Sequence, residues 1–142
     1  MSGRLAAWIL AAVLLGTGGA KLLDQAAFGN ALISVDLLPL LAARVLVLVL
    51  PWLEVVTAIA LLRPTWRRAG SVLACGLSLG FVFYSVAGAL LQRPANCGCL
   101  GSSRLVVGWT QHVIIAVAMV LAAILALRGS SLPAAGPLSP PV

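Results

Sequence analysis

Long apolar runs, separated by short polar segments, dominate this chain. Four of them can cross a bilayer, whose hydrocarbon core of about 30 Å needs roughly 20 helical residues. Lipid offers no hydrogen-bond partner to the backbone, so spanning runs of this kind must be helical. The pattern predicts transmembrane helices over residues 5–23, 40–62, 69–91 and 106–127. The expected fold class is all-α, an integral membrane four-helix bundle.

The segments between these runs are too short to form a second domain. We therefore expect one membrane domain over residues 1–128. Residues 129–142 are rich in Pro, Gly, Ser and Ala, a composition typical of a disordered tail.

The first apolar run also resembles a cleavable signal peptide. Arg4 precedes it, and the small residues Gly18-Gly19-Ala20 lie near its end. We favour a retained helix, because four crossings give the simplest topology for the remaining segments.

Composition agrees with lipid as the main solvent. Apolar residues make up 62% of the 142 positions and charged residues 8%, against about 45–50% and about 25% in soluble domains. The net charge of +6 comes from Lys and Arg residues scattered between the apolar runs. This distribution is typical of charges that flank membrane spans, and we expect no nucleic-acid partner.

The positive-inside rule predicts the orientation, because short loops rich in Lys and Arg stay in the cytoplasm. We expect the protein to lie in a bacterial inner membrane with both termini on the cytoplasmic side. Five arginines are then cytoplasmic, namely Arg4, Arg63, Arg67, Arg68 and Arg128. Four basic residues then lie on the outer side, namely Lys21, Arg44, Arg93 and Arg104. The compact cluster over residues 63–68 carries most of the argument. The loop over residues 92–105 is then extracytoplasmic, where disulfides persist.

Cys97 and Cys99 in that loop are the sharpest chemical signal. A disulfide between residues so close in sequence closes a small, strained ring, and Gly98 gives the backbone the freedom to form it. A strained, exposed disulfide is easily reduced, which suits exchange with a partner dithiol. Arg93 and Arg104 flank the pair and would raise its thiolate fraction.

Other roles for the two cysteines stay open at this point. They could form a permanent structural disulfide or remain inert thiols. A metal site is the weakest alternative, because the chain has a single His and two Met residues to add to the two thiolates. We therefore expect no metal.

His112 lies near the start of the fourth predicted helix, beside Gln111 and close to Trp109. As a base it could take a proton from Cys97 or Cys99, and as a donor it could hydrogen-bond a quinone carbonyl. These three residues are the candidate contacts for a quinone cofactor. The alternative is a hydrogen-bonded structural histidine near the membrane interface.

Glu54 lies well inside the second predicted helix, where an ionisable group is costly. Its candidate partners are Lys21 and Arg44. Pro51, three residues earlier, frees a backbone carbonyl and could open a small polar pocket. We favour a structural ion pair or a protonated, hydrogen-bonded Glu54 over proton relay or ligand binding.

The third predicted helix carries Cys75 and several small residues. Cys75 is too far along the helix to pair with the loop cysteines, so core packing is its expected role. The small residues predict close contacts with neighbouring helices; they are Gly76, Gly80, Ser85 and Gly88.

Several motifs resemble the methylamine utilisation protein MauE family, within the DoxX-like group of four-helix membrane proteins. The most specific is residues 96–101, Asn-Cys-Gly-Cys-Leu-Gly, close to the family's Cys-Gly-Cys-Phe-Gly signature but with Leu100 in place of Phe. The others are Gly19-x-Lys21, Phe28, Leu37-Leu38-Pro39 and the Leu-Pro-Trp-Leu-Glu run over residues 50–54. The resemblance spans about residues 16–127.

This resemblance implies a role in the maturation of periplasmic methylamine dehydrogenase, whose small subunit is rich in disulfides. It also implies a thioredoxin-like partner outside the cytoplasm. Our leading hypothesis is a membrane thiol-disulfide oxidoreductase in which Cys97 and Cys99 pass electrons between such a partner and an acceptor, in either direction, with a membrane quinone as the candidate acceptor. The alternatives are a non-catalytic assembly or scaffold subunit, and a small transporter built around Glu54 and Lys21.

Overall fold

A computed structural model describes residues 3–91 and 109–129, all-helical apart from short connections. Four long helices are apolar and long enough to cross a membrane. They are α1 (Gly3–Leu23), α3 (Leu40–Leu62), α4 (Arg67–Leu90) and α5 (Trp109–Arg128). Each bound lies within three residues of the one expected from the apolar runs. The predicted fold class, an all-α membrane bundle, is confirmed.

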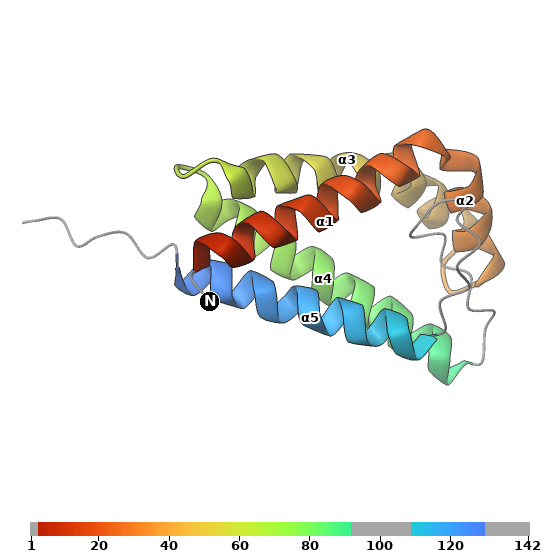
Figure 1. The fold of residues 1–142 in the computed structure, drawn as a ribbon. Helices are drawn as coiled ribbons and strands as arrows, with labels where there is room; N and C mark the ends of the chain where they lie inside the picture. The colour runs from red at the N-terminus through yellow and green to blue at the C-terminus, as the bar shows by residue number, and fades with distance from the viewer. Residues whose placement is uncertain (1–2, 92–108, 130–142) are drawn as a thin grey trace, which may run out of the picture.

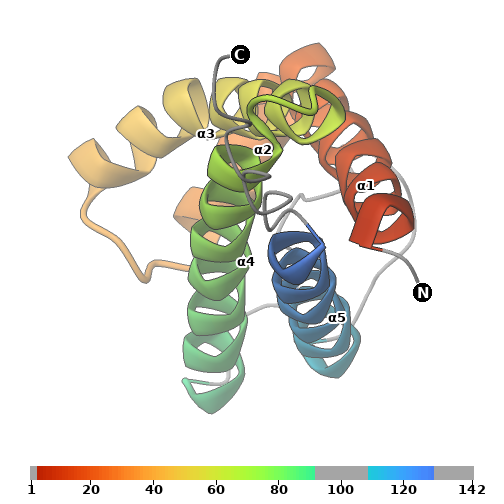
Figure 2. The same ribbon diagram turned by 90° about the vertical axis from the view of Figure 1, so that its left-hand side faces the viewer.

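The four helices surround one core, in the order α1, α3, α4, α5 (Figures 1 and 2). Its buried side chains are mostly small, and α1 supplies four of them, Ala7, Leu10, Ala11 and Leu14. Large apolar residues instead lie exposed on the outside of every span, as expected when lipid covers the bundle. Cleavage of α1 as a signal peptide would remove a wall of this core.

The predicted connection over residues 24–39 contains a fifth helix, α2 (Gln25–Ser34), which the apolar pattern did not indicate. Asp24 caps it, since its Oδ1 accepts a hydrogen bond of 2.9 Å from the Ala27 N–H. The helix is followed by Asp36, whose φ of 51° makes the chain turn. Pro39 then precedes the first turn of α3. α2 lies across one end of the bundle (Figure 1).

At the opposite end, Pro64 separates α3 from α4. Arg63 has the extended backbone that a following proline favours, with φ −86° and ψ 123°. The Trp66 N–H donates to the Arg63 carbonyl at 3.1 Å, which closes the turn. Arg67 Nε donates at 3.4 Å to the Leu61 carbonyl, one of the free carbonyls at the end of α3.

Both ends of the described chain lie at this same end of the bundle. A Cβ placed on Gly3 would lie 2.5 Å from the Gly129 Cα, so the first residue of α1 and the residue after α5 touch. α4 ends and α5 begins at the α2 end (Figure 1). Leu91 and Trp109, the described residues on either side of the gap, therefore both lie at the end opposite Gly3 and Gly129.

Candidate functional site

A buried ion pair joins α1 to α3. The Lys21 Nζ in the last turn of α1 donates to Glu54 Oε1, and the two side chains are 1% and 0% exposed. By the helical rise, Glu54 lies about 12 Å from the Leu62 end of α3 and about 21 Å from its Leu40 end. Arg44, the other candidate partner, is exposed. Of the two candidate partners, Lys21 holds the glutamate.

The pair forms where α1 and α3 lie close together. A Cβ on Gly18 would lie 3.1 Å from the Pro51 carbonyl oxygen and 3.1 Å from the Glu54 Cβ. Both contacts are tighter than a Cβ normally makes, so glycine is the residue that lets the α3 backbone come this close without a shift. The close contact lets the short glutamate side chain reach α1.

Other groups complete the surroundings of both charges. The Thr17 hydroxyl, one turn before Lys21, lies within hydrogen-bond distance of Glu54 Oε2, at 3.4 Å, and of the Val13 carbonyl in its own helix, at 3.1 Å. The Lys21 ammonium lies over the rings of Phe28 from α2 and Phe81 from α4, at 5.4 and 4.9 Å from their centres. Lys21 therefore connects all of the first four helices.

A buried ion pair is stable only when contacts such as these offset the cost of removing both charges from water. Removing two charges from water costs several kcal/mol per ion, and their attraction offsets this only with good geometry and further hydrogen bonds. A desolvated cation over an aromatic ring contributes about 2 kcal/mol. The arrangement also has a direction, because the carboxylate lies against α1 while the ammonium faces the two rings.

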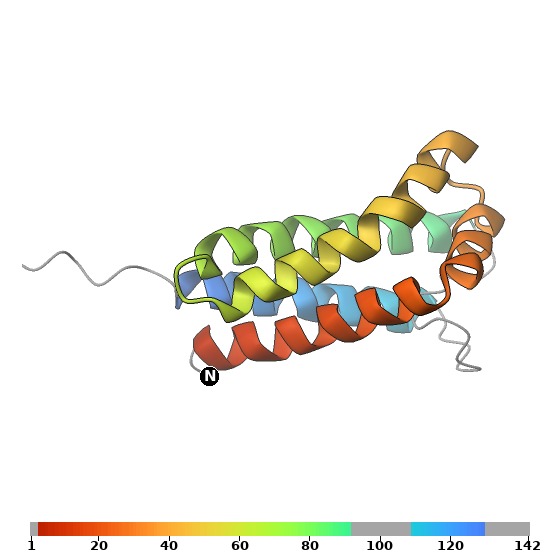
Figure 3. The same cartoon turned by 90° about the horizontal axis from the view of Figure 1, so that it is seen from above.

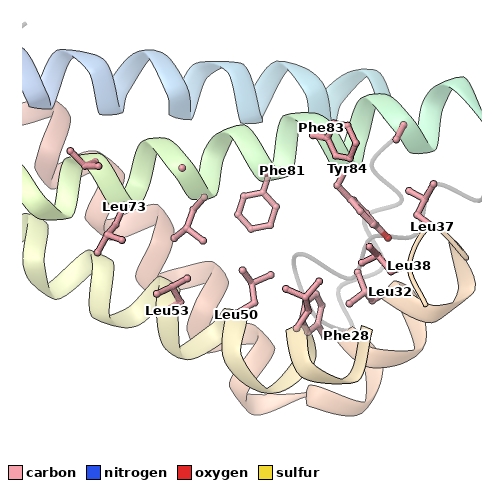
Figure 4. Close-up of a pocket in the computed structure, with 16 residues that line it drawn as sticks. Phe28, Leu32, Leu37, Leu38, Leu50, Leu53, Leu73, Phe81, Phe83 and Tyr84 are labelled. Carbon is pink, nitrogen blue, oxygen red and sulfur yellow. The ribbon is translucent and has the colours of Figure 1, made fainter. Parts of the chain in front are cut away.

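The same two rings also line an apolar pocket between α2, α3 and α4 (Figure 4). Its volume is about 580 Å³. Sixteen residues line it, and all except Tyr84 are glycine or have hydrocarbon side chains. Neither Glu54 nor Pro51 is among them, so this pocket is not the small polar one expected near Glu54, which stays a prediction.

Two glycines that were expected to make close helix contacts line this pocket instead. A Cβ on Gly76 or on Gly80 would have no atom within 4 Å. Figures 2 and 3 both show the first turns of α3 leaning away from α4. Ser85 and Gly88, further along α4, are buried as predicted.

Comparison with known proteins gives a family for this arrangement. The family model described as "Methylamine utilisation protein MauE" matches residues 1–129. The chain belongs to the MauE family. No curated protein and no solved structure matches it. The match covers all of the described bundle, including Lys21 and Glu54.

Not all of the site residues predicted for this MauE-family chain can be placed. Cys97 and Cys99 lie outside the described residues, as do all residues of the predicted tail over 129–142 except Gly129. Trp109 begins α5, followed by exposed Gln111 and partly buried His112, all at the α2 end of the bundle. Their proposed contact with a quinone stays a prediction. Cys75 is a free thiol partly buried against the core, in keeping with a packing role.

The sequence analysis missed Thr17, the two aromatic rings and the pocket. One signal could have revealed the first, because Thr17 and Lys21 are four residues apart on one face of an otherwise apolar helix. Phe28 was part of the family resemblance but had no assigned role. Phe81 lies in a run of apolar residues, where nothing distinguishes it from a residue that faces lipid.

Proposed function

We propose that this MauE-family protein is a membrane thiol-disulfide exchange protein that supports the maturation of disulfide-containing proteins outside the cytoplasm. The observation that carries the proposal is the Cys97-Gly98-Cys99 pair in a chain of this family. By the resemblance described above, methylamine dehydrogenase is the expected beneficiary and a thioredoxin-like protein the expected partner.

The exchange is a balanced two-electron step. A thiolate of one protein attacks a sulfur of the other's disulfide, and a mixed disulfide forms as the first S–S bond breaks. The second thiolate of the attacking protein then attacks the mixed disulfide and releases the other protein with both of its cysteines reduced. One disulfide becomes two thiols while two thiols become one disulfide, so two electrons and two protons change sides.

The distribution of charge supports an extracytoplasmic position for the cysteines. The termini end of the bundle carries Arg4, Arg63, Arg67, Arg68 and Arg128. Lys21, which sequence analysis counted on the opposite side, is buried and paired with Glu54. Without Lys21, five basic residues at the end that carries the termini compare with three on the other side. This difference favours a cytoplasmic location for the end with the termini.

Trapping the mixed disulfide tests the proposal. In the Cys99→Ser variant, an attack on the partner by Cys97 cannot be resolved, so we expect a covalent adduct that reductant releases and mass spectrometry identifies as a thioredoxin-like protein. Cys75→Ser is the matched control, because this thiol lies within α4, and it should leave the adduct unchanged. A chain without adduct, whose Cys97→Ser/Cys99→Ser variant still supports partner oxidation, would be a scaffold.

A reporter tests the topology independently. A periplasmic alkaline phosphatase fused after Gly101 should be active, and the same reporter fused after Trp66 should be inactive. The opposite pattern would place the cysteines in a reducing compartment and exclude the exchange role.

A further inference from the structure

The pocket between α2, α3 and α4 has the properties of a site for a small neutral ligand. Its volume of about 580 Å³ falls within the range of small-molecule sites, roughly 300–1,000 Å³. Val72 and Phe83 on its rim are 57% and 77% exposed on the outside of a membrane span, so it opens toward lipid. A ligand would enter from the bilayer.

The lining argues against a phospholipid headgroup. No charged side chain is among the sixteen residues that form the pocket. A phosphate held there would have no basic partner, and a buried unpaired charge is very costly. The occupant must therefore be uncharged in its bound part.

The ion pair next to the apolar pocket favours a ligand that carries a polar group. The Lys21 ammonium contacts Phe28 and Phe81, both of which line the pocket, whereas neither Lys21 nor Glu54 is among the lining residues. Of the two charges, the ammonium is the one that contacts rings of the pocket wall. It attracts the partial negative charge of a carbonyl oxygen, and low dielectric in the interior strengthens this attraction, although Glu54 offsets part of it.

Aromatic surfaces and one hydroxyl favour a flat ring over a plain hydrocarbon chain. Phe28, Phe81 and Tyr84 surround the pocket from α2 and α4 (Figure 4), and aromatic rings stack on flat conjugated ligands. In the same view the Tyr84 oxygen is directed toward Leu38 at the α2 end. A phenolic hydroxyl can also hydrogen-bond a carbonyl.

We propose that this pocket binds the ring of a lipid-soluble quinone, with a carbonyl directed toward Phe28 and Phe81, the two rings that Lys21 contacts. The role of this ligand rests on the proposed function. Oxidation of two thiols to a disulfide releases two electrons and two protons, and a quinone that takes up both becomes a hydroquinone. Binding itself does not depend on the cysteines.

Equilibrium binding of a tritiated benzoquinone with a ten-carbon tail tests the site. The full chain is placed in nanodiscs of a single phosphatidylcholine. Saturable binding is expected, and decanol, which has the tail without the ring, should compete only at about a hundredfold higher concentration. Absence of saturable binding, or equal competition by decanol, would overturn the proposal and assign the pocket to hydrocarbon chains.

Two glycine variants locate the ligand. Gly80→Leu places a side chain in the open space of the pocket and should weaken binding at least about tenfold. Gly16→Leu is the control, because Gly16 is equally open but lies on the exposed face of α1 away from the pocket. Equal affinity in both variants would place the quinone elsewhere, with the α5 start at His112 as the next site to test.

The ion pair and the cysteines each need a separate variant. Lys21→Met/Glu54→Gln removes both charges and should lower quinone affinity about fivefold while leaving decanol affinity unchanged, a change in selectivity that loosened packing would not produce. An unchanged ratio would remove Lys21 from the proposal. Cys97→Ser/Cys99→Ser should bind quinone normally, so loss of thiol exchange with retained binding would refute the proposed function and not the quinone site.

Discussion

The two faces of α3 are packed differently. Toward α1 the helix is so close that a Cβ at Gly18 would lie 3.1 Å from the Pro51 carbonyl oxygen, and the contact encloses an ion pair. Toward α4 the two helices touch at Gly70, where a Cβ would lie 2.8 Å from the Leu61 nitrogen, and then separate around the pocket at Gly76 and Gly80. Charges need a closed environment with every partner in place, whereas a hydrocarbon wall can remain open because lipid or a lipid-soluble ligand can cover it.

The largest expected effect comes from removing one charge of the ion pair between α1 and α3. Lys21→Met leaves the Glu54 carboxylate buried without its cation and should lower the free energy of unfolding by about 3–5 kcal/mol. Titration with SDS in mixed micelles, followed by circular dichroism, measures this. Lys21→Met/Glu54→Gln should recover most of the loss, because no unpaired charge remains. A double variant as unstable as the single one would mean that the pair itself, and not charge balance, holds the helices together.

The second-largest effect is expected from a larger residue at Gly18, where α1 and α3 are in close contact. Gly18→Val would force branched carbons against the Pro51 carbonyl and the Glu54 side chain, and overpacking of this kind costs about 1–3 kcal/mol. Gly19→Val is the matched control, since a Cβ at that position meets no atom within 4 Å. The same micelle titration should separate the two variants. Equal stabilities would show that α1 can move away from α3 at little cost.

Only part of this contrast could be predicted from the sequence. Runs of about twenty apolar residues require spanning helices, so the four-helix class follows from the apolar pattern. Glu54 stands out because a charge inside a span is rare. The α2 helix escaped the pattern because its ten residues have no long apolar run, and it depends on Asp24 as a cap.

The pocket could not be predicted because glycines in a span have two opposite uses. Gly70 brings two backbones together, while Gly76, two turns later on the same helix, leaves a space empty. Both are small residues in an apolar run, and sequence alone does not show whether a neighbouring helix follows or leans away. That difference depends on how α3 leaves the α2 connection, which is a tertiary property.

A third prediction concerns the aromatic rings that contact Lys21 and also line the pocket. Phe81→Leu removes one ring from the Lys21 ammonium and should cost about 1–2 kcal/mol of unfolding free energy. Phe83→Leu, on the same helix but 77% exposed, should change it by less than about 0.5 kcal/mol. A loss of the same size at both positions would mean that the cost comes from apolar contact alone and that the ring adds nothing for the cation.

The smallest expected effect comes from a substitution at Gly76, on the side of α4 that lines the pocket. Gly76→Leu adds a side chain where no atom lies within 4 Å, so the free energy of unfolding should change by no more than about 0.5 kcal/mol. Gly70→Leu on the same helix should be strongly destabilising, because its Cβ would meet the backbone of Ala60 and Leu61 at 2.8–2.9 Å and no rotation of a side chain can relieve that contact. The comparison is made in the same micelles and at the same SDS concentrations. If Gly76→Leu proved as costly as Gly70→Leu, then α3 would close on α4 along its whole length, and the two faces of α3 would be alike.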